Sequence, residues 1–243
     1  MFFPIKDENP AIRKPVVTVT LIAACVAVFL WEVTAGQAGL QQIVYRYGLV
    51  PSAFFGAEEF PAGFSNIPPS LSLLTSMFLH GGWMHLIGNM VFLWIFGNNI
   101  EDELGHMRFV AFYILSGLGA AALQLAMGPN SDIPMVGASG AISGVLGAYL
   151  VLYPRARILT LVFLGFFLAT ARIAAGWFLG IWFLMQAFFA LTSDPGQGGV
   201  AFWAHVGGFV AGLGLLFLLR PRGGLAGPLT PPSIGGPWRG PWG

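Results

Sequence analysis

Long runs of apolar residues alternate with short polar segments along most of the chain. Six of these runs approach the length of about 20 residues that a helix needs to cross roughly 30 Å of hydrocarbon. They are Val16–Val33, Leu71–Asn98, Phe109–Met127, Gly140–Tyr153, Ala174–Leu191 and Ala201–Leu219. The pattern predicts an all-α, polytopic membrane protein with a bundle of six transmembrane helices in residues 16–219.

The boundaries around the fourth and fifth runs stay open. Gly140–Tyr153 is short for a span, and a further apolar segment, Ile158–Ala169, follows it. This segment is predicted either to be a re-entrant or interfacial piece or to join the fifth span. The first run is interpreted as an uncleaved anchor, because it is longer than the apolar core of about 7–15 residues that is usual in a secretory signal.

Composition narrows the class of protein further. Apolar residues make up 56% of the chain and charged residues 9%, against about 25% charged in soluble domains. Neither a soluble globular domain nor a disordered chain fits these values. The formal net charge is +1 and the basic residues are spread out, so we expect no nucleic-acid partner. Cys25 is the single cysteine, which excludes an intrachain disulfide framework and a thiol-cluster metal site.

Basic residues predict how the chain is oriented. Ten of the eleven lysines and arginines fall on one side of the predicted spans, and only Arg46 falls on the other. The positive-inside rule then places both termini in the cytoplasm, with residues 1–15 as a cytoplasmic segment of a multi-pass protein of the plasma (inner) membrane. The loop 37–70 lies outside, where its aromatic residues favour the lipid bilayer surface. The Pro/Gly-rich residues 220–243 are predicted to form a flexible cytoplasmic tail.

Candidate chemistry comes from polar residues in apolar runs, where they are costly. His80, His85 and Asn89 stand near the beginning of the second span, and His85 and Asn89, four residues apart, share one helix face. Ser139 opens the fourth span, and His205 lies near the start of the sixth. All five fall toward the outer half of their helices, so the sequence predicts a polar cavity open to the outside.

Glycine spacing predicts which helices touch. Small residues repeat at every fourth position from Gly140 in the fourth span, and Gly208 and Gly212 do so in the sixth. This spacing lets two helices approach closely. His205 shares the glycine face of its helix, so the contact brings it against Ser139. A nucleophile and a base then lie within hydrogen-bond reach, with no third residue needed to hold them.

Each motif alone is typical of helix packing, and only the combination favours an enzyme. A transporter or channel is the alternative from another class, but no chain of intramembrane Asp or Glu residues indicates an ion path. A metalloprotease fits less well, because the chain has no His-Glu-x-x-His motif and His80 and His85 are one residue too far apart.

In their order and spacing these motifs resemble the rhomboid family of intramembrane serine proteases. The resemblance covers about Leu71–Leu219, and the six-helix core with a long first outer loop agrees with the family's plan. The matching motifs are His80-x-x-x-x-His85-x-x-x-Asn89, Gly97-x-x-x-Glu101-x-x-x-Gly105, Gly137-x-Ser139-Gly140 and Ala204-His205-x-x-Gly208-x-x-x-Gly212.

The resemblance implies roles for these residues. Ser139 is then the nucleophile and His205 the general base, in a dyad without a carboxylate. His85, Asn89 and the backbone N–H of Ser139 stabilise the oxyanion. Glu101 is structural and caps the next turn at the cytoplasmic end, and no cofactor or metal is expected. The supporting residues are His80, which orders water or the loop above the site, and Gly137, Gly140, Ser143, Gly208 and Gly212.

Ser143 departs from the family pattern, because several members carry an aromatic residue there that stacks on the histidine. We therefore expect His205 to be oriented by a hydrogen bond from Ser143 or by packing of another residue. The expected partners are transmembrane protein substrates, cut near the outer face where a helix unwinds easily. The aromatic fifth span around Trp182 is either a lateral gate or a lipid-facing surface. The alternative function is that of a catalytically inactive relative that binds membrane helices.

Overall fold

The computed structural model describes residues 2–56, 67–164, 167–194 and 198–221 of the 243-residue chain. The helices in these residues are α1 (Val16–Thr34), α2 (Gly36–Tyr47), α3 (Pro51–Phe54), α4 (Pro69–Thr75), α5 (Trp83–Leu104), α6 (His106–Met127), α7 (Ser139–Leu152), α8 (Ala175–Thr192) and α9 (Phe202–Leu219). The strands are β1 (Phe2–Asp7), β2 (Arg157–Leu164) and β3 (Phe167–Ala174).

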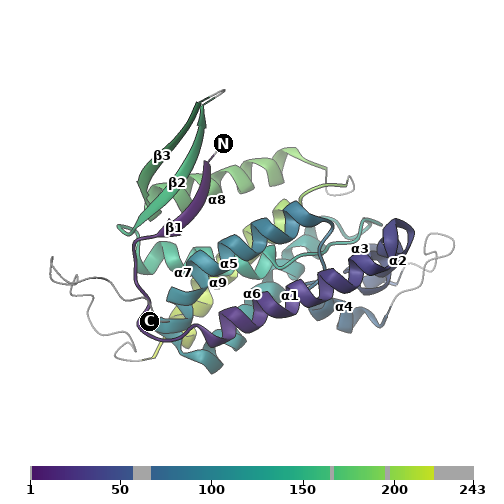
Figure 1. The fold of residues 1–243 in the computed structure, drawn as a ribbon. Helices are drawn as coiled ribbons and strands as arrows, with labels where there is room; N and C mark the ends of the chain where they lie inside the picture. The colour runs from purple at the N-terminus through teal and green to yellow at the C-terminus, as the bar shows by residue number, and fades with distance from the viewer. Residues whose placement is uncertain (1, 57–66, 165–166, 195–197, 222–243) are drawn as a thin grey trace, which may run out of the picture.

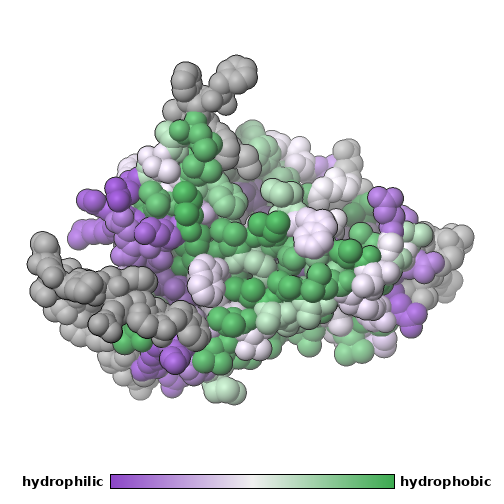
Figure 2. Space-filling view, in the orientation of Figure 1, coloured by the Kyte–Doolittle hydropathy of each residue, from purple (hydrophilic) through white to green (hydrophobic). Residues whose placement is uncertain are grey.

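The six predicted spans correspond to α1 and α5–α9, which lie together as one bundle (Figure 1). Among the described residues, α1, α6, α8 and α9 are long and apolar enough to cross a membrane, and α7 is a shorter apolar helix. Figure 2 shows hydrophobic residues gathered over the middle of the visible face, with hydrophilic residues toward its two ends. The prediction of a polytopic, mainly helical membrane protein is confirmed.

The second span begins later than predicted. Residues from Leu71 onward belong to the short α4, and α5 begins only at Trp83, directly after the glycine pair Gly81-Gly82. The loop 37–70 is also more ordered than a simple connection, since it contains most of α2 and all of α3. Residues 57–66 of this loop and residues 222–243 of the tail lie outside the described residues, so the predictions for them stay predictions.

The described residues of the segment Ile158–Ala169 belong to strands β2 and β3 and do not join the fifth span. β2 and β3 form an antiparallel hairpin, and β1 from the N-terminal segment pairs with the other edge of β2. β-Branched and aromatic residues favour strands, and pairing with β1 satisfies backbone groups that an edge strand would leave open. Figure 1 shows this three-stranded sheet beside α8.

α7 is the centre of the bundle. Its residues from Gly140 to Tyr149 are all buried, and it contacts α5, α6, α8 and α9. A Cβ atom on Gly208 would strike the carbonyl oxygen of Gly140, and one on Gly212 would strike the backbone of Gly144. These contacts show why small residues recur in α7 and α9, because any side chain there would separate the two helices.

The bundle has two chemically different ends. We call one the serine end, because α7 begins there with Ser139 beside the beginnings of α5 and α9. We call the other the carboxylate end, because α5 finishes there with the buried residues Glu101, Asp102 and Glu103.

Glu101 ties the beginning of α1 to the carboxylate end. Its carboxylate accepts the backbone N–H groups of Val17 and Thr18 at 2.8 and 2.7 Å, and the Thr18 hydroxyl at 2.7 Å. It also lies 2.6 Å from Nδ1 of His106 at the start of α6. Glu101 is therefore structural, as expected, but the helix that it caps is α1, which precedes it by more than eighty residues.

Candidate active site

Ser139 and His205 meet where α7 and α9 begin. The Ser139 hydroxyl oxygen lies 2.9 Å from Nε2 of His205, although the two residues are 66 positions apart in the chain. The glycine contacts between α7 and α9 set this distance, because they hold the helix backbones together one turn away. At the first residue of a helix, free N–H groups and the helix dipole favour negative charge developing on the serine or its adduct.

Gln186 of α8 completes a chain of three side chains. Its Oε1 lies 2.7 Å from Nδ1 of His205, on the opposite side of the imidazole from Ser139. An amide oxygen only accepts, so Nδ1 of a neutral imidazole donates to it and Nε2 keeps a lone pair for the Ser139 hydroxyl. The sequence reasoning missed this residue and expected that no third residue was needed. The available signal was a glutamine within an apolar span.

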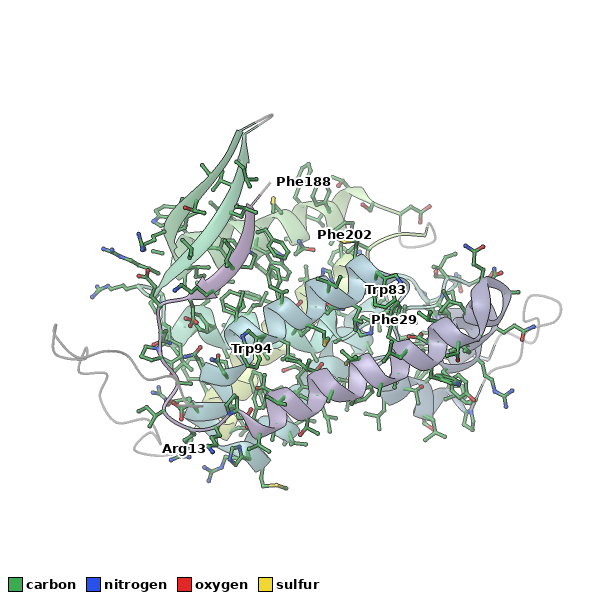
Figure 3. The ribbon with its side chains drawn as sticks, viewed as in Figure 1. Arg13, Phe29, Trp83, Trp94, Phe188 and Phe202 are labelled. Carbon is green, nitrogen blue, oxygen red and sulfur yellow. The ribbon has the colours of Figure 1, made fainter. Side chains whose placement is uncertain are left out.

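Ser143 does not orient the imidazole by a hydrogen bond. Its hydroxyl instead donates to the backbone oxygen of Ser139 at 2.7 Å, within α7. Packing comes from Trp182, whose ring lies 5.9 Å from that of His205 at an interplanar angle of 34°, and from Phe202, which meets it edge-on at 6.4 Å. Figure 3 shows Phe202 at the beginning of α9. We expected His205 to be oriented either by a hydrogen bond from Ser143 or by packing of another residue. The structure shows packing by other residues, and it adds the hydrogen bond with Gln186.

His85, Asn89 and Gly137 converge beside Ser139. Gly137 has a φ of +124°, and a Cβ atom there would lie 2.7 Å from Nε2 of His85 and 3.6 Å from Nδ2 of Asn89. The backbone N–H of Gly81 donates to Nδ1 of His85 at 3.3 Å, which leaves Nε2 of the neutral ring as a donor. Nδ2 of Asn89 is buried without a hydrogen-bond partner among the described residues. Two side-chain donors are thus available near Ser139.

His80 lies behind His85 rather than beside Ser139. Its ring is 5.2 Å from that of His85, and its backbone N–H lies 3.2 and 3.3 Å from the two carboxylate oxygens of Glu32 on α1. The sequence reasoning did not single out Glu32, although an acidic residue in an apolar run is costly and therefore informative. Phe29, one turn earlier on α1, packs edge-on against Trp83 at 4.9 Å (Figure 3). His80 and Glu32 therefore connect α1 to the beginning of α5.

A cavity of about 610 Å³ joins these groups. Most of the predicted site residues line it, whereas His80, Gly208 and Gly212 are not among its lining residues in the described part of the chain. Gln124, a further polar side chain in the lining, accepts the backbone N–H of Ala204 at 3.2 Å. The His, Cys, Asp and Glu side chains of the described residues form no group of three that would hold a metal ion. The predicted residues in the lining are His85, Asn89, Gly137, Ser139, Gly140, Ser143 and His205.

Fold and site together define a class: a polytopic helical membrane protein with a half-buried serine–histidine hydrogen bond at a mainly apolar cavity that also has polar side chains in its lining. The rhomboid domain matches residues 70–222, which is more than half of the chain. The chain therefore belongs to the rhomboid family.

Several relatives share about a third of their aligned residues with the chain. RHOMBOID-like protein 5 of Arabidopsis thaliana is 35% identical over 164 residues, which is 64% of this chain and 47% of that protein. The rhomboid protease GluP of Bacillus subtilis is 31% identical over 138 residues, covering 56% of this chain and 24% of GluP. Rhomboid protein 1, mitochondrial, of Saccharomyces cerevisiae is 35% identical over 101 residues, covering 40% and 29%. The matches thus span less than half the length of these relatives.

Proposed function

We propose that this chain is an intramembrane serine endopeptidase that cleaves transmembrane segments of membrane proteins through Ser139 and His205. The observation that carries the proposal is the 2.9 Å contact between the Ser139 hydroxyl and Nε2 of His205, at a cavity inside an apolar bundle that His85 and Asn89 also line. The relative named as a protease, GluP, supports the same activity at the level of the family.

Acyl transfer through the serine follows from this geometry. The Ser139 oxygen attacks the scissile carbonyl carbon while Nε2 of His205 takes the hydroxyl proton. The carbonyl oxygen becomes an oxyanion, for which Nε2 of His85, Nδ2 of Asn89 and the Ser139 N–H are the donors. The tetrahedral adduct collapses to an acyl-enzyme as His205 gives its proton to the leaving amine. Water, deprotonated by the same imidazole, then releases the new carboxylate and restores the serine.

The position of the cavity indicates the class of substrate. A nucleophile inside the bundle reaches only chains that enter the membrane, and a helix exposes a carbonyl only where it unwinds. With the bias of basic residues placing both termini in the cytoplasm, the serine end faces outward and cleavage falls near the outer surface. We propose the plasma (inner) membrane as the location of this multi-pass protein.

The test is cleavage of a fluorogenic transmembrane substrate by the purified protein in proteoliposomes. We expect cleavage by the wild type and none above background by Ser139→Ala or His205→Ala, with EDTA leaving the rate unchanged. Cleavage that persists in Ser139→Ala, or that EDTA abolishes, would contradict the proposal. Substrate binding without cleavage by the wild type would instead favour an inactive, helix-binding relative.

A further inference from the structure

Gln186 is a polar side chain that takes no part in the steps of the proposed reaction. It lies near the end of α8 that faces the beginning of α9, and only 8% of it is exposed. A buried amide in an apolar helix is costly unless its polar atoms are paired. Its Oε1 is paired with Nδ1 of His205 at 2.7 Å, while Gln186 is not among the described residues that line the cavity. It therefore touches the proposed base but not the space for the substrate.

We propose that Gln186 is a positioning residue for the general base, which fixes the tautomer and the orientation of the His205 ring. This inference rests on the proposed function. As the acceptor for the Nδ1 proton, the amide keeps the Nε2 lone pair directed at the Ser139 hydroxyl. In the other tautomer Nε2 carries the proton and cannot accept one from the serine. The pairing is uncharged, so Gln186 orients the ring without the electrostatic stabilisation that a carboxylate gives to an imidazolium.

Other contacts of the imidazole cannot select the tautomer. Trp182 and Phe202 present aromatic rings to it, and such contacts restrict the ring plane without accepting a strong hydrogen bond. The Ser143 hydroxyl donates to the backbone of Ser139. Among the residues that the structure describes, His85 on α5 is the ionisable side chain that interacts electrostatically with His205. The acceptor on Nδ1 is therefore what distinguishes the productive tautomer from the unproductive one.

Three variants separate positioning from simple packing. Gln186→Leu keeps most of the volume but removes the acceptor, and Gln186→Glu keeps an acceptor and adds a negative charge. Met185→Leu is the control on the same helix, because Met185 is 45% exposed. In proteoliposomes we expect Gln186→Leu to lower kcat by about 10–100-fold, as for a buried donor left unpaired, with KM nearly unchanged. We expect Met185→Leu to match the wild type.

The pH–rate profile of Gln186→Glu distinguishes positioning from packing, because a side chain that only packs against His205 would not change this profile. A carboxylate beside Nδ1 stabilises the imidazolium, so the acidic limb of the pH–rate profile moves to higher pH while much of the activity at alkaline pH is kept. An unmoved profile, with Gln186→Leu as active as Met185→Leu, would overturn the inference. If Gln186→Leu fails to fold, the profile of Gln186→Glu decides.

The tautomer can also be measured without any substrate. In protein labelled with ¹⁵N-histidine, the His205 signals are assigned by their loss in His205→Ala. We expect a protonated Nδ1 in the wild type and a mixture of tautomers in Gln186→Leu. The same tautomer in both would contradict the role of Gln186. This measurement remains decisive if the wild type proves inactive on every substrate, an outcome that would overturn only the proposed protease function.

Discussion

The two ends of α5 bury polar groups in different ways. At the carboxylate end, Glu101 accepts three hydrogen bonds from α1. Asp102 accepts the backbone N–H groups of Ile12 and Arg13 at 2.8 and 3.1 Å. Arg13 is labelled in Figure 3 and marks this end of the bundle. Glu103 pairs with Arg220 at 2.6 Å. At the serine end, by contrast, Nδ2 of Asn89 has no partner among the described residues, and Asn89 lines the cavity. Oδ1 of Asn99, toward the carboxylate end, also lacks a partner, but Asn99 is not among the described residues that line the cavity.

This difference separates polar groups that hold the bundle together from groups that, under the proposed function, are available to a substrate. A buried donor without a partner costs about 1–3 kcal/mol, so it persists only where the surrounding structure imposes it. The carboxylates are paired with groups of their own chain and add to stability. Asn89 instead lines a cavity and has a donor without a partner, which is the arrangement expected for a group whose acceptor would arrive with the proposed substrate. Variants at the serine end should thus affect turnover, and those at the carboxylate end stability.

The largest expected effect of this kind is at Gly137. Gly137→Ala places a methyl group against Nε2 of His85 at a φ of +124°, where side chains are strained. Because the methyl group displaces the ring of His85, a proposed oxyanion donor, and also strains the backbone two residues before Ser139, we expect kcat to fall by about 10³-fold or more, measured with the fluorogenic substrate. Gly180→Ala is the matched control, since a Cβ there meets nothing within 4 Å, and it should behave as the wild type.

Asn89 tests a single donor. We expect Asn89→Ala to lower kcat by about 10²–10³-fold, the usual cost of losing one oxyanion donor, with KM and thermal stability nearly unchanged. Asn98→Ala, on the same helix toward the carboxylate end, should leave kcat near the wild-type value. Equal rates for Asn89→Ala and the wild type would remove Asn89 from the oxyanion site and weaken the contrast between the two ends.

Glu101 tests the opposite end. Glu101→Ala leaves the first N–H groups of α1 and the Thr18 hydroxyl without their acceptor, and we expect a loss of about 3 kcal/mol in the free energy of unfolding. Glu101→Gln keeps one acceptor oxygen and should lose less. Thermal melts in detergent, followed by tryptophan fluorescence, measure this order. Well below the melting transition, turnover should stay near wild type, and a selective loss of kcat at full stability would contradict the division.

Asp7 gives the smallest expected effect, through pH. Burial raises the pKa of Asp7 in β1 from 3.8 to about 6, although the hydrogen bond from the Tyr149 hydroxyl lowers it in part. The folded state then holds a proton that the unfolded state has lost, so stability falls as the pH rises from about 4 to 6. Compared with Asp7→Asn, the wild type should lose about 4–8 °C of melting temperature over that interval, because a pKa of about 6 in the folded state lowers its stability by about 2 kcal/mol between those pH values. Parallel melting curves would show that Asp7 does not titrate there.

Much of the fold could be predicted from the sequence because membranes enforce simple patterns. Apolar runs indicate the spanning helices, and glycine spacing in α7 and α9 indicates where two backbones touch. Polar residues at helical spacing, such as His85 and Asn89, indicate a shared face. These signals are local in the chain, and each corresponds to one physical requirement.

The parts that could not be predicted depend on partners far apart in the chain. The proposed role of Gln186 depends on its contact with Nδ1 of His205. The structural role of Glu101 depends on its hydrogen bonds to the beginning of α1. From their sequence alone, β2 and β3 resemble an apolar membrane segment, and their strand structure becomes clear only from the pairing of β2 with β1. In each case the sequence marks the side chain or segment as unusual but does not identify its partner, since hydrogen-bond acceptors and strand edges are specified by what they meet.

Labelling of Ser139 by a fluorophosphonate probe tests the central claim most directly, because the probe reacts with an activated serine and needs no knowledge of the substrate. Mass spectrometry of the purified protein should find the phosphonate adduct on Ser139 in the wild type. The adduct should be strongly reduced in His205→Ala and, more weakly, in Gln186→Leu. Absence of an adduct on Ser139 in folded wild-type protein, or equal labelling in His205→Ala, would contradict the account.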